Sequence, residues 1–98
     1  LGAYDGTKLH YVGSVGGGFS KRDLEITYSA LTQLHTANSP FANEPKVDKF
    51  LFWCDPLLTI QVKYGEFTEK RNLRFPIFSA LRPDIDPHDC TLAAISDS

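Results

Sequence analysis

Residues 66–84 read EFTEKRNLRFPIFSALRPD, a stretch that combines a strand end, a charged turn and a polar terminal triplet. The run Glu69–Asn72 is polar and charged, which is typical of a hairpin turn. The chain is expected to return as a short strand over Leu73–Phe75, which the following proline confines to a sheet edge or a strand end. The stretch ends on an arginine and an acid two residues apart, Arg82 and Asp84.

The segment before this stretch carries the clearest strand pattern in the chain. Apolar residues occupy every second position from Leu58 to Tyr64, with polar residues between them. This period of two is that of a half-buried strand. Further back, Val47–Cys54 contains a dense apolar run and is predicted to be a strand covered on both faces. The preceding Thr36–Lys46 has the composition of a loop.

A hairpin is predicted near the N-terminus. Asp5-Gly6 is a tight-turn signal, and it separates the expected strands Leu1–Tyr4 and Lys8–Val15. The glycines from Gly16 to Gly18 then break the second strand. Their spacing does not fit the G-x-G-x-x-G fingerprint of a dinucleotide site, so a tight strand-to-helix connection is the expected role.

One helix is predicted after these glycines, over Lys21–His35. Ser20 is a suitable N-cap, and Asp23 stands where a capping box places its acid. Four apolar residues follow at helical spacing and define one face of the helix: Leu24, Tyr28, Leu31 and Leu34.

The order of strands, one helix and further strands predicts a mostly-β fold, an OB-fold-like small barrel with one inserted helix. A length of 98 residues suits a single domain over 1–98. The phenylalanines, the tyrosines and Trp53 are expected to supply the core. Because the predicted strand at the N-terminus is so short, we expect the first strand of the barrel to be truncated at Leu1.

Composition excludes several classes of protein. The chain has no apolar run approaching the roughly 20 residues of a membrane span, and no leader peptide is predicted. Cys54 and Cys90 form no metal-binding pair, so we expect reduced thiols, no metal site and a cytoplasmic protein. The net charge of −2 argues against a free-standing nucleic-acid binder, but it allows a module that grips DNA beside a more basic neighbour.

Several short motifs occur in order along almost the whole chain. They are YVGSVGGGF at 11–19, SPF at 39–41, the W-x-x-P of residues 53–56, the E-x-T and L-R-x-P-x-F elements within 66–78, and the R-x-D of 82–84. In this combination the chain resembles the C-terminal OB domain of ATP-dependent DNA ligases of the bacterial end-joining class. The resemblance implies one part of a larger enzyme, because the K-x-D-G run that carries the nucleophilic lysine is absent from the sequence. Alone, the chain is expected to be inactive.

The resemblance places Arg82 and Asp84 on the R-x-D-K motif of these ligases. In their first step a lysine attacks the α-phosphate of ATP and pyrophosphate leaves, so a guanidinium near the outer phosphates stabilises the leaving group. The acid beside it orients the guanidinium. This chain departs from the motif at Ile85, where the family carries lysine, and no lysine or arginine follows Arg82. The alternative is that Arg82 forms only a surface salt bridge with Asp84 or Asp86.

Four cations cluster around the predicted hairpin and are the candidates for DNA phosphate contacts: Lys63, Lys70, Arg71 and Arg74. The resemblance implies duplex DNA with nicks or ends and the adenylation domain of the same polypeptide as partners. It implies ATP and Mg²⁺ as cofactors of the full-length enzyme. This chain alone is expected to bind neither of them tightly.

Two other functions stay open. Ile85, the acidic C-terminal segment and the net charge favour a non-catalytic OB module that binds DNA or docks a partner protein. The OB domain of an mRNA-capping nucleotidyltransferase shares the same broad architecture, although the YVGSVGGGF and SPF motifs favour the ligases.

Overall fold

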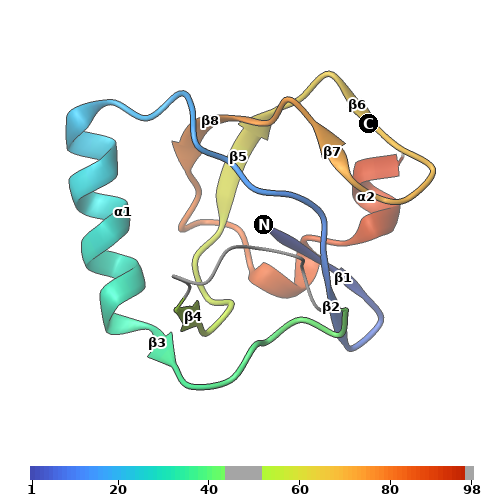
Figure 1. Ribbon diagram of the computed structural model, residues 1–98, viewed down its shortest axis with the longest axis horizontal. Coiled ribbons are helices and arrows are strands. Elements are labelled where there is room, and N and C mark those ends of the chain that lie inside the picture. The colour runs from blue at the N-terminus through green and yellow to red at the C-terminus, as the bar shows by residue number, and fades with distance from the viewer. Residues whose placement is uncertain (44–51, 97–98) are drawn as a thin grey trace.

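The computed structural model describes residues 1–43 and 52–96. Short strands dominate it, with one long helix between them and short helices at the C-terminal end (Figure 1). The strands are β1 (Gly2–Asp5), β2 (Lys8–Tyr11), β3 (His35–Thr36), β4 (Trp53–Cys54), β5 (Ile60–Lys63), β6 (Glu66–Phe67), β7 (Leu73–Arg74) and β8 (Ile77–Leu81). The helices are α1 (Lys21–Gln33), the 3-10 turn η1 (Pro87–Asp89) and α2 (Leu92–Ser96).

The strands pair two by two and always antiparallel: β1 with β2, β3 with β4, β5 with β8, and β6 with β7. Isolated bridges join some of these strands to other segments, such as Leu9 of β2 to Phe41 and Ile77 of β8 to Gly17. The mostly-β class is confirmed. Over the described ranges the pairs do not join into one closed sheet, so the predicted barrel is not confirmed.

The N-terminal hairpin is confirmed, with the turn at Gly6-Thr7, where Gly6 has a φ of 63°. The second strand ends at Tyr11, not at the predicted Val15. The cause is that Val12 pairs with the hairpin only through its N–H, opposite Leu1, while its carbonyl turns to Leu73 of β7. Its N–H donates to the Leu1 carbonyl at 2.9 Å, and its own carbonyl accepts from the Leu73 N–H at 2.7 Å.

The core is small and lies where these segments meet. Its central cluster consists of Ala3, Val12, Leu73 and Leu92, and Val12 is only 1% exposed. The members come from β1, the segment after β2, β7 and α2. One short C-terminal helix therefore completes a core that the N-terminal hairpin begins.

The C-terminal segment is ordered, although its sequence shows little hydrophobic periodicity. The Tyr4 N–H donates to the Cys90 carbonyl at 2.7 Å, and the Tyr4 ring stacks on His88 with centroids 5.0 Å apart. In Figure 1 this orange-red segment runs beside β1 before it reaches α2. The segment is thus held by backbone pairing and by Leu92, neither of which a hydrophobic period reveals.

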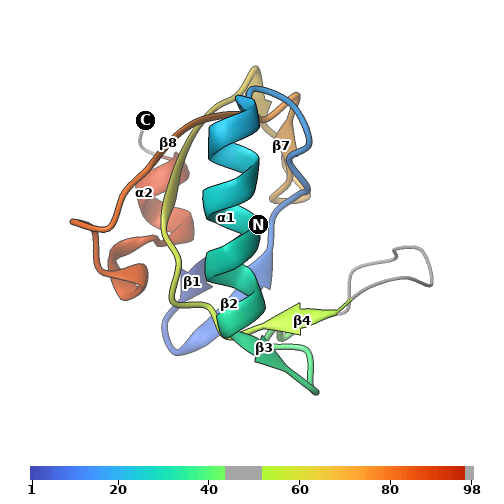
Figure 2. The same cartoon turned by 90° about the vertical axis from the view of Figure 1, so that its left-hand side faces the viewer.

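Helix α1 begins as predicted, with reciprocal bonds between Ser20 and Asp23 that form a capping box. It ends at Gln33, two residues before the predicted end, because His35 pairs with Cys54 in a short ladder. The predicted apolar face is not a core face, since α1 has no buried residue and Tyr28 is 66% exposed. Figure 1 shows α1 along one outer side of the molecule, and in Figure 2 this side faces the viewer.

The C-terminal end of α1 is tied to the chain after β4. The Cys54 thiol donates to the Leu31 carbonyl at 3.3 Å, and the Asp55 N–H donates to the Leu34 carbonyl at 2.8 Å. Cys54 and Cys90 are free thiols, as expected, and burial raises the pKa of the Cys54 thiol. The larger part of the predicted strand Val47–Cys54 lies outside the described residues.

The prediction that the phenylalanines form the core is correct for Phe78, which is 4% exposed, and wrong for Phe52 and Phe75, which are 52% and 78% exposed. Phe78 lies on β8, a strand that the sequence pattern did not indicate. Its ring stacks on Phe19 with centroids 4.1 Å apart.

Within the described ranges, no helix combines the length and the apolar character that a membrane span requires.

Gly18 allows the chain to cross β8 closely. It has a φ of +91°, and a Cβ atom there would collide with the carbonyl oxygen of Phe78 and the side chain of Ile77. We therefore expect Gly18→Ala to lower the free energy of unfolding by about 2–5 kcal/mol, from strain and overpacking together. Urea unfolding followed by circular dichroism measures this. Gly16→Ala is the matched control, because a Cβ atom there meets nothing within 4 Å; equal stability of the two variants would contradict the packing described here.

Candidate functional site

Arg82 lies directly after β8 and is held by the backbone of its neighbouring strand. Its N–H donates to the carbonyl of Thr59 at 2.9 Å, which extends the β5–β8 pairing by one step. Thr59 is only 7% exposed. The backbone of Arg82 is therefore anchored on a buried position, whereas its side chain is 38% exposed.

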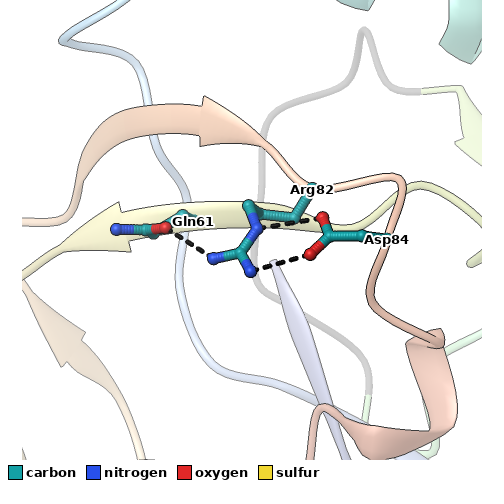
Figure 3. Close-up of polar contacts among 3 residues, drawn as sticks. All are labelled: Gln61, Arg82 and Asp84. Atoms are coloured by element: carbon teal, nitrogen blue, oxygen red, sulfur yellow. Dashed lines mark hydrogen bonds and ion pairs between the residues drawn. The ribbon is translucent and has the colours of Figure 1, made fainter.

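The guanidinium of Arg82 has three hydrogen bonds to two side chains (Figure 3). Nε donates to Oδ1 of Asp84 at 3.0 Å, and Nη2 donates to Oδ2 of Asp84 at 2.9 Å. On the other side, Nη1 donates to Oε1 of Gln61 at 2.8 Å. A guanidinium carries five N–H donors. These three bonds leave two donors for a further acceptor.

This pairing keeps both Arg82 and Asp84 ionised. The hydrogen bond and the charge of Asp84 raise the pKa of Arg82. The hydrogen bond from Arg82 is the main cause that lowers the pKa of Asp84. The salt bridge that the sequence offered as an alternative is present. It neutralises much of the charge that an incoming phosphate would meet, but it leaves the guanidinium oriented.

The position at which the ligase motif carries lysine has a structural use here. The N–H of Ile85 donates to the carbonyl of Arg82 at 3.2 Å and closes a turn. Its apolar side chain is half-buried. Asp86, the next residue, pairs with His88 at 3.1 Å, whereas the guanidinium of Arg82 bonds to Asp84 and Gln61. A second cation beside Arg82 is therefore missing from this segment.

Three of the four predicted DNA-binding cations lie on the β6–β7 hairpin and the fourth, Lys63, lies on β5. Arg74 pairs with Glu66 at 3.2 Å, and Arg71 pairs with Asp5 at 3.6 Å. Lys70 lies in the turn and lines a shallow depression together with Arg74 and Glu66. The hairpin surface thus mixes charges of both signs and is not a purely basic patch.

Phe75 is a surface residue that was not among the residues predicted for the site. It has a φ of 55° and is 78% exposed, directly after Arg74. A positive φ in a bulky residue is a strained conformation, and the proline that follows restricts this residue further. The ring lies near Gly65, where a Cβ atom would be 3.4 Å from the Phe75 ring. The Phe-Pro pair was the signal available in the sequence.

The donors of this site suit a phosphate group. The two remaining guanidinium N–H groups match phosphate oxygens. In the part of the chain that the structure describes, no three side chains of His, Cys, Asp or Glu come together as a metal site.

The sequence model of the ATP dependent DNA ligase C terminal region matches residues 1–85. The chain belongs to this family. The multifunctional non-homologous end joining protein LigD of Mycolicibacterium smegmatis is 41% identical over 83 residues, which are 83% of this chain and 11% of that protein. The corresponding LigD repair protein of Mycobacterium tuberculosis is 37% identical over 83 residues, again 83% of this chain and 11% of that protein.

Solved ligase structures agree with this family. The crystal structure of the ligase domain from M. tuberculosis LigD matches with a TM-score of 0.84 and 35% identity, over 92% of this chain and 30% of that chain. A mycobacterial DNA ligase D complexed with ATP and MES matches with a TM-score of 0.79 and 33% identity, over 92% of this chain and 31% of that chain. The chain spans about a tenth of the curated relatives and about a third of the solved ligase chains.

The Arg82–Asp84 pair predicts how the titration of Asp84 depends on Arg82. Because the pKa of Asp84 lies below its ordinary 3.8, the stability from this carboxylate is present above that pH and is lost as the pH falls through the depressed pKa. Carboxyl NMR titration is expected to show Arg82→Gln moving the Asp84 midpoint up towards 3.8.

Asp86 provides the internal control, because its pKa is lowered by hydrogen bonds from His88 and not by Arg82. Its midpoint should stay in place in the Arg82→Gln variant. An Asp84 midpoint that does not move would show that the two side chains are not paired in solution.

Proposed function

We propose that this chain is the C-terminal OB domain of a larger, cytoplasmic ATP-dependent DNA ligase of the end-joining type. It assists the adenylation of a lysine on another domain of the same polypeptide, and it then helps to hold nicked or broken duplex DNA. The family match and the order of strand pairs around one helix support this proposal. The observation that carries it is the oriented Arg82 guanidinium, with two donors left for an oxygen acceptor.

Lysine adenylation is favoured by an oriented guanidinium near the leaving pyrophosphate. The lysine amine forms a bond to the α-phosphorus of ATP as the bond to the pyrophosphate oxygen breaks. Negative charge builds on the leaving pyrophosphate, and oriented N–H donors stabilise it. Arg82 supplies those donors, and Asp84 holds the guanidinium in one plane. Mg²⁺ in the full-length enzyme neutralises further phosphate charge, and this chain alone binds neither ATP nor Mg²⁺ tightly.

The first test is the rate of enzyme–AMP formation in the full-length protein. Arg82→Ala is expected to slow single-turnover adenylation by about 10²–10³-fold, because it removes an oriented donor to the leaving group. Arg82→Lys should recover only part of the rate, since a point charge lacks the planar fork. Lys21→Ala, which removes an exposed cation at the start of α1, is the matched control. An unchanged rate in Arg82→Ala refutes the role of Arg82.

The β6–β7 hairpin is the part of the chain that we propose for DNA. Lys70, Arg71 and Arg74 supply phosphate contacts there, with Lys63 on the neighbouring β5. Phe75 adds an exposed ring held in a strained backbone conformation, which is the kind of feature that marks ligand contacts. An aromatic ring beside arginines suits the sugars and base edges of a groove.

The salt dependence of DNA affinity distinguishes the phosphate contacts of the cations from the contact of the Phe75 ring. In the full-length protein, Arg74→Gln should weaken binding to nicked duplex and reduce the slope of log affinity against log salt by about 1. Phe75→Ala should weaken binding with the slope unchanged, because the ring displaces no counterion. Arg22→Gln, an exposed arginine on α1, serves as the control. Slopes that are identical for Arg74→Gln and the wild type would remove Arg74 from the DNA surface.

Two observations favour the second candidate, a non-catalytic binding module. Asp84 offsets the charge of Arg82, and Ile85 replaces the lysine of the motif. In that case the chain only holds DNA or docks a partner protein. Adenylation that is insensitive to Arg82→Ala, together with salt-dependent DNA binding, is the outcome that selects this candidate.

A further inference from the structure

We propose that Gln61 is a positioning residue for Arg82 during adenylation. This inference rests on the proposed function and adds to it a residue that lies outside the R-x-D triplet. Gln61 acts through Arg82 and not on the nucleotide itself.

The strand register brings these two side chains together. In the β5–β8 pair, Gln61 lies opposite Ala80. Arg82 comes two residues after Ala80 in the sequence. Residues two apart on a strand point to the same face, so Gln61 and Arg82 are diagonal neighbours on one face. The Arg82 N–H bond to Thr59 continues the ladder and holds this relation.

The small side chain of Ala80 allows the Arg82 side chain to reach Gln61. Ala80 stands directly opposite Gln61 and has only a methyl group. The Arg82 side chain therefore reaches across, and its Nη1 donates to the Gln61 amide oxygen at 2.8 Å. Figure 3 shows the guanidinium between Gln61 on one side and Asp84 on the other.

Gln61 and Asp84 hold the guanidinium in different ways. Asp84 binds Nε and Nη2 and neutralises part of the charge. Gln61 is neutral, so it orients Nη1 without lowering the attraction for a phosphate. It remains a partner of Nη1 when phosphate oxygens compete with the Asp84 carboxylate. Without Gln61, the guanidinium keeps its charge but loses one of its two side-chain supports.

The test is a double-mutant cycle in the full-length ligase, measured by single-turnover adenylation over a range of ATP concentrations. Gln61→Met keeps the length of the side chain and removes the amide oxygen. It should lower the rate at saturating ATP by roughly tenfold, with little change in the ATP concentration at half-maximal rate. In the Arg82→Ala background the same change should have no further effect. Gln33→Met, at another exposed glutamine, is the control, and thermal unfolding confirms that each variant is folded.

The outcomes distinguish a failure of the role proposed for Gln61 from a failure of the role proposed for Arg82. If Arg82→Ala is slow but Gln61→Met is as fast as the wild type, Gln61 has no positioning role while the proposed function stands. If Gln61→Met is equally harmful with and without Arg82, it does not act through Arg82 and the inference is wrong. If neither Arg82→Ala nor Gln61→Met slows adenylation, the proposed role of Arg82 is wrong, and so is the role of Gln61 that depends on it.

Discussion

Val12 is the point on which the rest of the structure depends. Its N–H and carbonyl bind Leu1 and Leu73, and its side chain is 1% exposed in the central cluster. Burial of a valine stabilises a fold by about 1.5–3 kcal/mol, which is a large share for so small a core. Because Val12 joins the N-terminal hairpin to β7, it also fixes the hairpin that carries Arg74 and Phe75.

The segment that carries Arg82 is held at both of its ends. Before it, β8 pairs with β5, and the Arg82 N–H reaches Thr59. After it, Tyr4 binds the Cys90 carbonyl, and Leu92 enters the core. The guanidinium is therefore presented from a fixed backbone, although the side chain itself is exposed. This arrangement suits the proposed role, in which donors are oriented before the phosphate arrives.

The sequence predicted those features that depend on local chemistry. The turn after Asp5, the capping box of Ser20 and Asp23, and the charged hairpin between β6 and β7 are all present. The adjacency of Arg82 and Asp84 also followed, because two residues on a tight turn are close in any fold. The family was correctly inferred from ordered motifs, and the family model agrees over residues 1–85.

Features that depend on distant contacts were not predictable in the same way. Strand β8 lacks a clean alternation because Ser79 sits in a register shift opposite Gln61 and Val62. The C-terminal helix was missed because five residues carry no helical period, and its place depends on the packing of Leu92 in the core cluster. Likewise, Gln61 became a site candidate only when the β5–β8 register brought it to Arg82.

The central proposal is that this chain serves a lysine-adenylating enzyme. The most direct measurement is the intact mass of the full-length protein after incubation with ATP and Mg²⁺, starting from protein freed of any earlier adduct. We expect one covalently bound AMP, which is lost on addition of pyrophosphate. A folded protein that acquires no AMP under these conditions would contradict it.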